Sequence, residues 1–149
     1  MADHKAEQIL DAFTTAVTGL ATTGANVERD KVYNLDDAIT AGLSVEMGSD
    51  IKRDDETQGW ELVMYTLSVV INIYVKQSSS TPLSQTLNQI RKEIVVALQA
   101  APTLGLSFVQ DTIEGSALEP VNGPGEKPMS MQRFEWAVVY QRSRTDPST

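Results

Sequence analysis

The amino-acid sequence predicts an α+β domain, in which a mainly antiparallel sheet of four to five strands carries two amphipathic helices on one face. Three observations support this class. One long segment alternates apolar and polar residues with a period of two, two other segments repeat apolar residues at steps of three and four, and no internal repeat is visible. The expected order is helix, strand, strand, long strand, helix, strand, strand.

The first helix is expected over residues 3–21. Its apolar residues recur at steps of three and four and form one stripe for packing: Ala6, Ile9, Leu10, Phe13, Val17 and Leu20. Asp3 can cap its start, and Gly24 offers a stop. Two short strands are then expected between residues 26 and 48. Residues 48–59 are rich in charge and turn residues and poor in apolar ones, so they predict a solvated loop.

The long strand covers residues 61–75, which read ELVMYTLSVVINIYV. Every odd position from Val63 to Val75 is apolar, whereas Thr66, Ser68 and Asn72 stand at even positions. At about 3.3 Å per residue such a strand spans roughly 50 Å, which exceeds the usual length. We therefore expect either a bulge or a projection into a neighbouring subunit.

A second helix is expected to follow Thr81, because Pro82 suits the first helical position and Pro102 marks an end. Its stripe consists of Leu83, Leu87, Ile90, Ile94, Ala97, Leu98 and Ala101. Two strands are then expected at residues 106–113 and 131–142, joined by a loop at 114–128. Residues 1–142 should form one domain, and the polar residues 143–149 should be a disordered tail.

The two faces of the sheet carry different predictions. Phe134, Trp136 and Tyr140 lie on one face of the last strand, and their alternation favours core packing over a base-stacking platform. The opposite face is not fully polar, and we expect another subunit to cover it. Its apolar residues are Val70, Tyr74, Ala137 and Val139.

Composition excludes several classes of function. The chain has 149 residues, no cysteine, and a net charge of −8, so disulfides and thiol nucleophiles are excluded and tight nucleic-acid binding is disfavoured. Residues 62–75 are too short and too polar for a membrane helix, and residues 1–20 lack the continuous apolar core of a signal peptide. We therefore expect a soluble protein.

Reactive groups are sparse. The single histidine, His4, stands near the terminus and has no partners for a catalytic triad or a histidine metal site. The acidic residues of 50–56 lack the spacing of a calcium loop, and residues 122–127 (NGPGEK) lack the context of a phosphate loop. We expect no catalytic, cofactor or metal site, although a carboxylate enzyme remains a minor alternative.

Several short motifs resemble a known family. They are residues 23–29 (TGANVER), 32–33, 38–39, 43–45 with Gly48, the long alternating strand, the helix at 87–98 and the closing residues 139–142. Together they resemble the tail terminator proteins of long-tailed bacteriophages, over most of the chain. A related tail-completion or neck protein would share these motifs, and a non-viral α+β binding module is the alternative from another class.

The resemblance implies a structural virion protein that assembles in the host cytoplasm and sits at the head-proximal end of the tail. Such proteins form a ring, typically a hexamer, which caps the tail tube, stops its growth and joins it to the head connector. DNA passes through the channel as non-specific cargo. Six copies at −8 would carry about −48, so acidic side chains lining the channel would repel DNA phosphates.

Two sets of residues are candidates for these roles. The channel-facing or tube-facing candidate is the acidic set Asp50, Asp54, Asp55 and Glu56, with the loop at 114–127 as the alternative. Aromatic and apolar side chains dominate interface energetics, and the candidates for ring or tube contacts are Trp60, Tyr65, Tyr74, Ile113 and Leu118. For Tyr65 the alternative is plain core packing. Ile113 and Leu118 are expected to belong to a segment that orders on docking.

Overall fold

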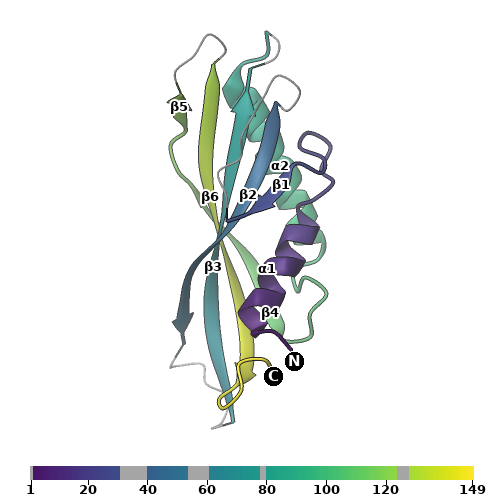
Figure 1. The fold of residues 1–149 in the computed structure, drawn as a ribbon, viewed down its shortest axis with the longest axis vertical. Coiled ribbons are helices and arrows are strands. Elements are labelled where there is room, and N and C mark those ends of the chain that lie inside the picture. The colour runs from purple at the N-terminus through teal and green to yellow at the C-terminus, as the bar shows by residue number, and fades with distance from the viewer. Residues whose placement is uncertain (1, 31–39, 54–60, 78–79, 124–127) are drawn as a thin grey trace.

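A computed structural model of the chain describes residues 2–30, 40–53, 61–77, 80–123 and 128–149. It contains a six-stranded sheet with two helices on one face, as Figure 1 shows. The elements are α1 (Lys5–Ala16), β1 (Val27–Arg29), β2 (Ala41–Lys52), β3 (Leu62–Lys76), α2 (Leu83–Ala100), β4 (Val109–Ala117), β5 (Val121–Gly123) and β6 (Met129–Ser143). The α+β class is thus confirmed.

The sheet is mixed rather than antiparallel throughout. Its strand order is β1-β2-β3-β6-β4, with β5 paired to the other end of β6 on the same side as β4. β1 runs parallel to β2, and all other pairs are antiparallel. The prediction therefore missed two features of the sheet: the parallel pairing of β1 with β2, and the strand β5. A three-residue strand such as β5 has too little alternation to be recognised in a sequence.

The first helix is shorter than expected. His4, and not Asp3, caps it, because the Nδ1 atom of His4 accepts a hydrogen bond from the backbone N–H of Ala6 at 3.0 Å. The helix ends at Ala16, next to threonines whose hydroxyls donate to carbonyls one turn earlier, as from Thr14 to Leu10 at 2.7 Å. Such bonds compete with regular helical geometry. The second helix lies where its stripe predicted it.

For the long strand β3 we expected either a bulge or a projection into a neighbouring subunit. The structure has a bulge, but it lies in the neighbouring strand β2. β3 pairs with β6 along its whole length, whereas the register between β2 and β3 shifts between Met47 and Asp50. Gly48 stands at this shift, and a Cβ there would lie 2.8 Å from the Ser68 hydroxyl. β2 continues to Lys52, so the prediction of a solvated loop from residue 48 was wrong, because a glycine bulge was read as a strand end.

A second correction concerns the loop predicted at 114–128. β4 continues to Ala117 through another register shift, at Gly115, and β5 follows at Val121–Gly123. A Cβ on Gly115 would lie 2.6 Å from the Glu135 carbonyl oxygen, so glycine permits the close approach of β4 to β6. In the described part of this segment, Gly115 marks a bulge and Pro120 stands in a short connection between β4 and β5, whereas residues 124–127 lie outside the described residues.

The core lies between the sheet and the helices. Both helices place their apolar stripes against it, and Phe13 of α1 meets the Trp136 ring edge-to-face at 6.4 Å. Phe134, Trp136 and Tyr140 are fully buried, which confirms the predicted core face of β6. On the helix-free face of the sheet, Val70 and Val139 are also buried.

The segment expected to be a disordered tail folds back onto the body. The carbonyl of Pro147 accepts a hydrogen bond from the backbone N–H of Lys5 at 2.9 Å, and the N–H of Arg144 donates to the carbonyl of Glu61 at 2.9 Å. Figure 1 accordingly shows the two chain ends close together at one end of the molecule. Among the described helices, neither has the length and apolar content needed to cross a membrane.

Candidate assembly surface

Two edges of the sheet are open in the described part of the chain. β1 covers β2 only at Leu43–Val45, so the remaining half of β2, Glu46–Lys52, has no strand beside it there. β4 pairs with β6 on one side, and its other side faces no described strand. Figure 1 shows the free half of β2 and strand β4 on opposite sides of the same end of the sheet. Open edges present unpaired N–H and C=O groups, which favour pairing with another strand.

Exposed apolar side chains gather on the edge strands of the sheet. Five of the six large exposed hydrophobic residues of the described chain lie in or beside β2, β4 and β5: Met47 (48% exposed), Ile51 (61%), Ile113 (45%), Leu118 (47%) and Val121 (62%). The sixth, Val96, is on α2. Single exposed apolar residues are ordinary, but their concentration on open strands indicates a surface for association.

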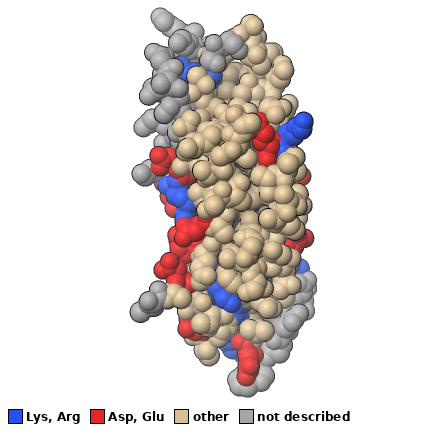
Figure 2. Space-filling view, turned by 90° about the vertical axis from the view of Figure 1, so that its right-hand side faces the viewer, with Lys and Arg blue, Asp and Glu red and all other residues tan. Residues whose placement is uncertain are grey.

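The helix-covered side has a different character. Figure 2 shows a broad uncharged area on this side, with charged side chains concentrated along its left margin and others at the upper right, the right margin and the lower end. Ion pairs also form here, since Arg29 of β1 contacts Glu7 at 3.0 Å and Asp11 at 2.9 Å on α1. This side therefore does not present one continuous acidic field.

The three aromatic residues predicted to make ring or tube contacts do not share one environment. Tyr65 is half-buried, stacks on Tyr140 with ring centroids 5.9 Å apart, and accepts a hydrogen bond from Arg142 at 2.8 Å, which favours the core interpretation. Tyr74 is half-buried on the helix-free face, level with Met131 of β6. Trp60 lies outside the described residues.

Ile113 and Leu118 are exposed, as an interface role requires. Ile113 lies within β4, paired with Ala137, in agreement with the strand expected at 106–113, whereas Leu118 does not lie in the long loop expected there. Ordering on docking stays a prediction. Leu118 follows β4 directly, and its backbone N–H donates to the carbonyl of Arg133 at 2.9 Å. Both side chains are therefore presented by a backbone that is already bonded to β6.

Asp50 belongs to β2 and not to an acidic loop. Its Oδ2 atom accepts a hydrogen bond from the Tyr140 hydroxyl at 2.7 Å, while its Oδ1 atom is buried and has no hydrogen-bond partner among the described residues. Burial raises the pKa of the Asp50 carboxyl, and the bond from Tyr140 opposes this shift. Burial, reinforced by Asp50, also raises the pKa of Tyr140. Asp54, Asp55 and Glu56 lie outside the described residues, so their channel-facing role stays a prediction.

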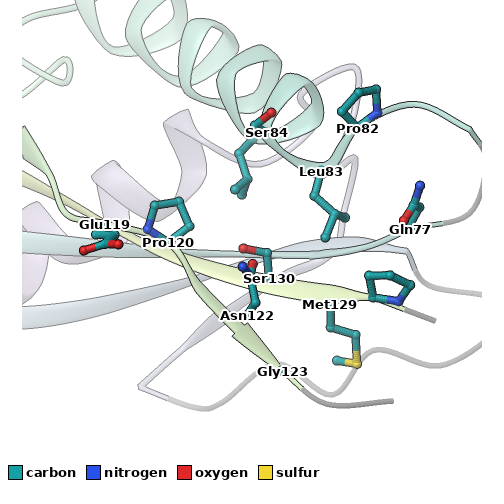
Figure 3. A pocket seen from close by; sticks show the side chains of 12 residues that line it. Gln77, Pro82, Leu83, Ser84, Glu119, Pro120, Asn122, Gly123, Met129 and Ser130 are labelled. Carbon is teal, nitrogen blue, oxygen red and sulfur yellow. The ribbon is translucent and has the colours of Figure 1, made fainter. Parts of the chain in front are cut away.

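A pocket of about 530 Å³ lies between the first turn of α2 and the start of β6 (Figure 3). Leu83 and Ser84 of α2 form one wall, while Asn122 and Ser130 of β5 and β6 form the other. Ser130 is 4% exposed and its hydroxyl has no partner, and the side chain of the helix cap Pro82 cannot accept from the first-turn N–H groups. No sequence pattern predicts this pocket, because its walls are more than 30 residues apart in the chain and meet only when α2 packs on the sheet.

Among the described residues, no group of three or more His, Cys, Asp or Glu side chains lies close enough to hold a metal ion. His4 uses its Nδ1 atom to cap α1. The side chains that the fold brings together are instead apolar residues on open edges.

No protein-family model matches the chain, and no curated protein matches it.

Proposed function

We propose that this chain is a structural virion protein, which forms a ring on the end of a phage tail tube, ends tube growth and provides the surface for joining the head connector. The observation that carries the proposal is the pair of open sheet edges lined by exposed apolar side chains. The resemblance of the motifs to tail terminator proteins supports the same role.

A ring requires each copy to present two different, complementary surfaces. A contact between unlike surfaces repeats around an axis and closes when the rotation divides a full turn. The open halves of β2 and β4 lie on opposite margins of one sheet, so the two surfaces are available on one copy. Two identical surfaces would instead favour a closed dimer.

The charge balance suits the passage of DNA. A net charge of −8 per copy gives the ring a negative field, which disfavours tight binding of phosphates to its wall. In this proposal the partners are further copies of the chain, the tail tube protein and the head connector, with DNA only as cargo.

The decisive experiment is to remove the protein from assembling tails and measure tube length by electron microscopy. Overlong tubes that fail to join heads are expected, and tubes of normal length joined to heads would refute the role. Mass measurement of the purified chain, alone and with tube protein, gives a cheaper first result. A ring-sized species under either condition is expected, and a monomer under both would contradict the proposal.

The pocket beside α2 favours one alternative, a small binding module without a role in tails. Its volume of about 530 Å³ falls within the usual range for ligand sites. Under this alternative, the pocket variant Leu83→Trp would abolish function and variants of the open edges would have no effect. The tail role predicts the reverse, so one set of variants separates the two.

A further inference from the structure

We infer that neighbouring copies of this chain join by strand pairing, with the free half of β2 in one copy lying antiparallel to the open edge of β4 in the next. This inference specifies how neighbouring copies of the proposed ring contact each other. It rests on the proposed function only for the number of copies and for the role in tails. The occupant of each edge is a second copy of the same chain.

The first argument is that the two edges lie at the same level of the sheet. Following the cross-strand pairs, Lys52 of β2 is level with Tyr65, then Tyr140, then Val109 of β4. At the other end of the free segment, Met47 is level with Val69, then Trp136, then Glu114. A neighbour related by rotation about an axis along the strands therefore presents its β2 edge at the height of β4.

The second argument is direction. β2 is antiparallel to β3, β3 to β6, and β6 to β4, so β4 runs opposite to β2 within one copy. Rotation about an axis along the strands preserves these directions. The β2 of one copy then meets the β4 of its neighbour in the antiparallel sense, and the same contact repeats around the ring.

The third argument concerns the exposed isoleucines. Ile51 stands opposite Thr66 and is level with Val139, whereas Ile113 stands opposite Ala137. Val139 and Ala137 are two residues apart on β6 and so point to the same face of the sheet. In the joined sheet Ile51 and Ile113 become diagonal neighbours on that face, about 7–8 Å apart at Cα, within reach of long side chains. Burying both covers two of the six large hydrophobic side chains that are exposed in the described chain.

β1 limits the contact, because it occupies the other half of the β2 edge and stops the pairing at Val45.

Disulfide trapping tests the contact directly, because the chain contains no cysteine. The informative variant carries Ile51→Cys and Asp111→Cys, which stand level with each other and would face across the joined strands at about 4.5–5.5 Å between Cβ atoms. The control carries Ile51→Cys and Val121→Cys, since Val121 pairs with Met131 at the opposite end of the sheet. Mild oxidation of the first variant should give a ladder of covalent multimers, read on denaturing gels.

The control should give no ladder. Equal ladders in both variants, or no ladder in either, would overturn the inference. A second measurement needs no cysteine: Ile113→Arg should weaken association at least tenfold in analytical ultracentrifugation with an unchanged circular dichroism spectrum. Val96→Arg, an exposed site on α2, should leave association unchanged. If trapping succeeds while tails without the protein have normal length, the strand contact stands and the tail role fails.

Discussion

The hydroxyl of Tyr140 on β6 donates a hydrogen bond to the Asp50 carboxylate on β2 at 2.7 Å, across the intervening strand β3. The bond fixes the free half of β2, which is the half with an open edge. It also provides a hydroxyl donor for a carboxylate whose other oxygen is buried without a partner among the described residues. This side-chain pair thus adds to the backbone pairing with β3 that positions one proposed contact strand.

Tyr140→Phe should lower the free energy of unfolding by about 1.5–3 kcal/mol, because a hydrogen bond to a charged group is lost. Urea unfolding at neutral pH measures this loss.

The same substitution should raise the pKa of Asp50 further, since the donated bond opposes the upward shift caused by burial. Folded Asp50 binds its proton more tightly than the unfolded chain does, so unfolding free energy falls as pH rises from the unfolded pKa through the folded one. Urea unfolding between about pH 3 and pH 7 should show a larger fall in the variant than in the unmodified protein. Adding Asp50→Asn should remove this excess fall, and a fall that persists would contradict the assignment.

Glu93→Gln should remove a stabilising contribution that is present at neutral pH. Burial alone would raise the pKa of Glu93, but hydrogen bonds from Thr22, with N–O and O–O distances of 2.8 and 2.6 Å, outweigh it and lower that pKa. The contribution is present above the unfolded pKa and is lost as pH falls through the folded one. The stability difference between the two proteins should therefore shrink on acidification. A difference independent of pH would show that the carboxylate charge plays no part.

Gly115→Ala should destabilise the fold by about 1–3 kcal/mol, because the new Cβ would lie 2.6 Å from a backbone oxygen that cannot rotate away. Gly123→Ala is the matched control, since its nearest neighbour would be 3.9 Å distant. Urea denaturation of both variants gives the comparison. Equal stabilities would show that the close approach of β4 to β6 is absent in solution.

Phe13→Ala should cost about 3–5 kcal/mol, since the ring is fully buried and meets Trp136 edge-to-face. Val96→Ala, at a largely exposed site on α2, should change stability by less than about 0.5 kcal/mol. Thermal or urea unfolding measures both. A small effect at Phe13 would mean that α1 does not contribute to the core.

The elements with long, regular patterns were predictable from the sequence. The alternation from Val63 to Val75 and the stripe from Leu87 to Leu98 identified β3 and α2, because each pattern extends over enough residues to exclude the other period. The errors lay at glycines. Gly48 and Gly115 were read as ends of strands, whereas both permit a register shift inside a strand, and a single sequence does not distinguish these roles.

The candidate surface was less predictable than the fold. Ile113 and Leu118 were identified as exposed apolar residues, but Met47 and Ile51 were missed, because their exposure depends on which strand covers β2. The order of strands in a sheet is set by pairings between distant segments, such as Leu62 with Ser143. Local patterns contain no information about those pairings, so the open edges became visible only in three dimensions.

The position of β6 has a consequence for biosynthesis. This strand is the last to be made, yet it lies between β3 and β4 and pairs with β5 as well. Until the ribosome releases residues 129–143, β3 has no partner on one side and β4 and β5 have none at all within the described sheet. Cotranslational folding of this sheet can therefore proceed no further than a partial sheet before β6 emerges, and nascent chains would need protection from aggregation until then.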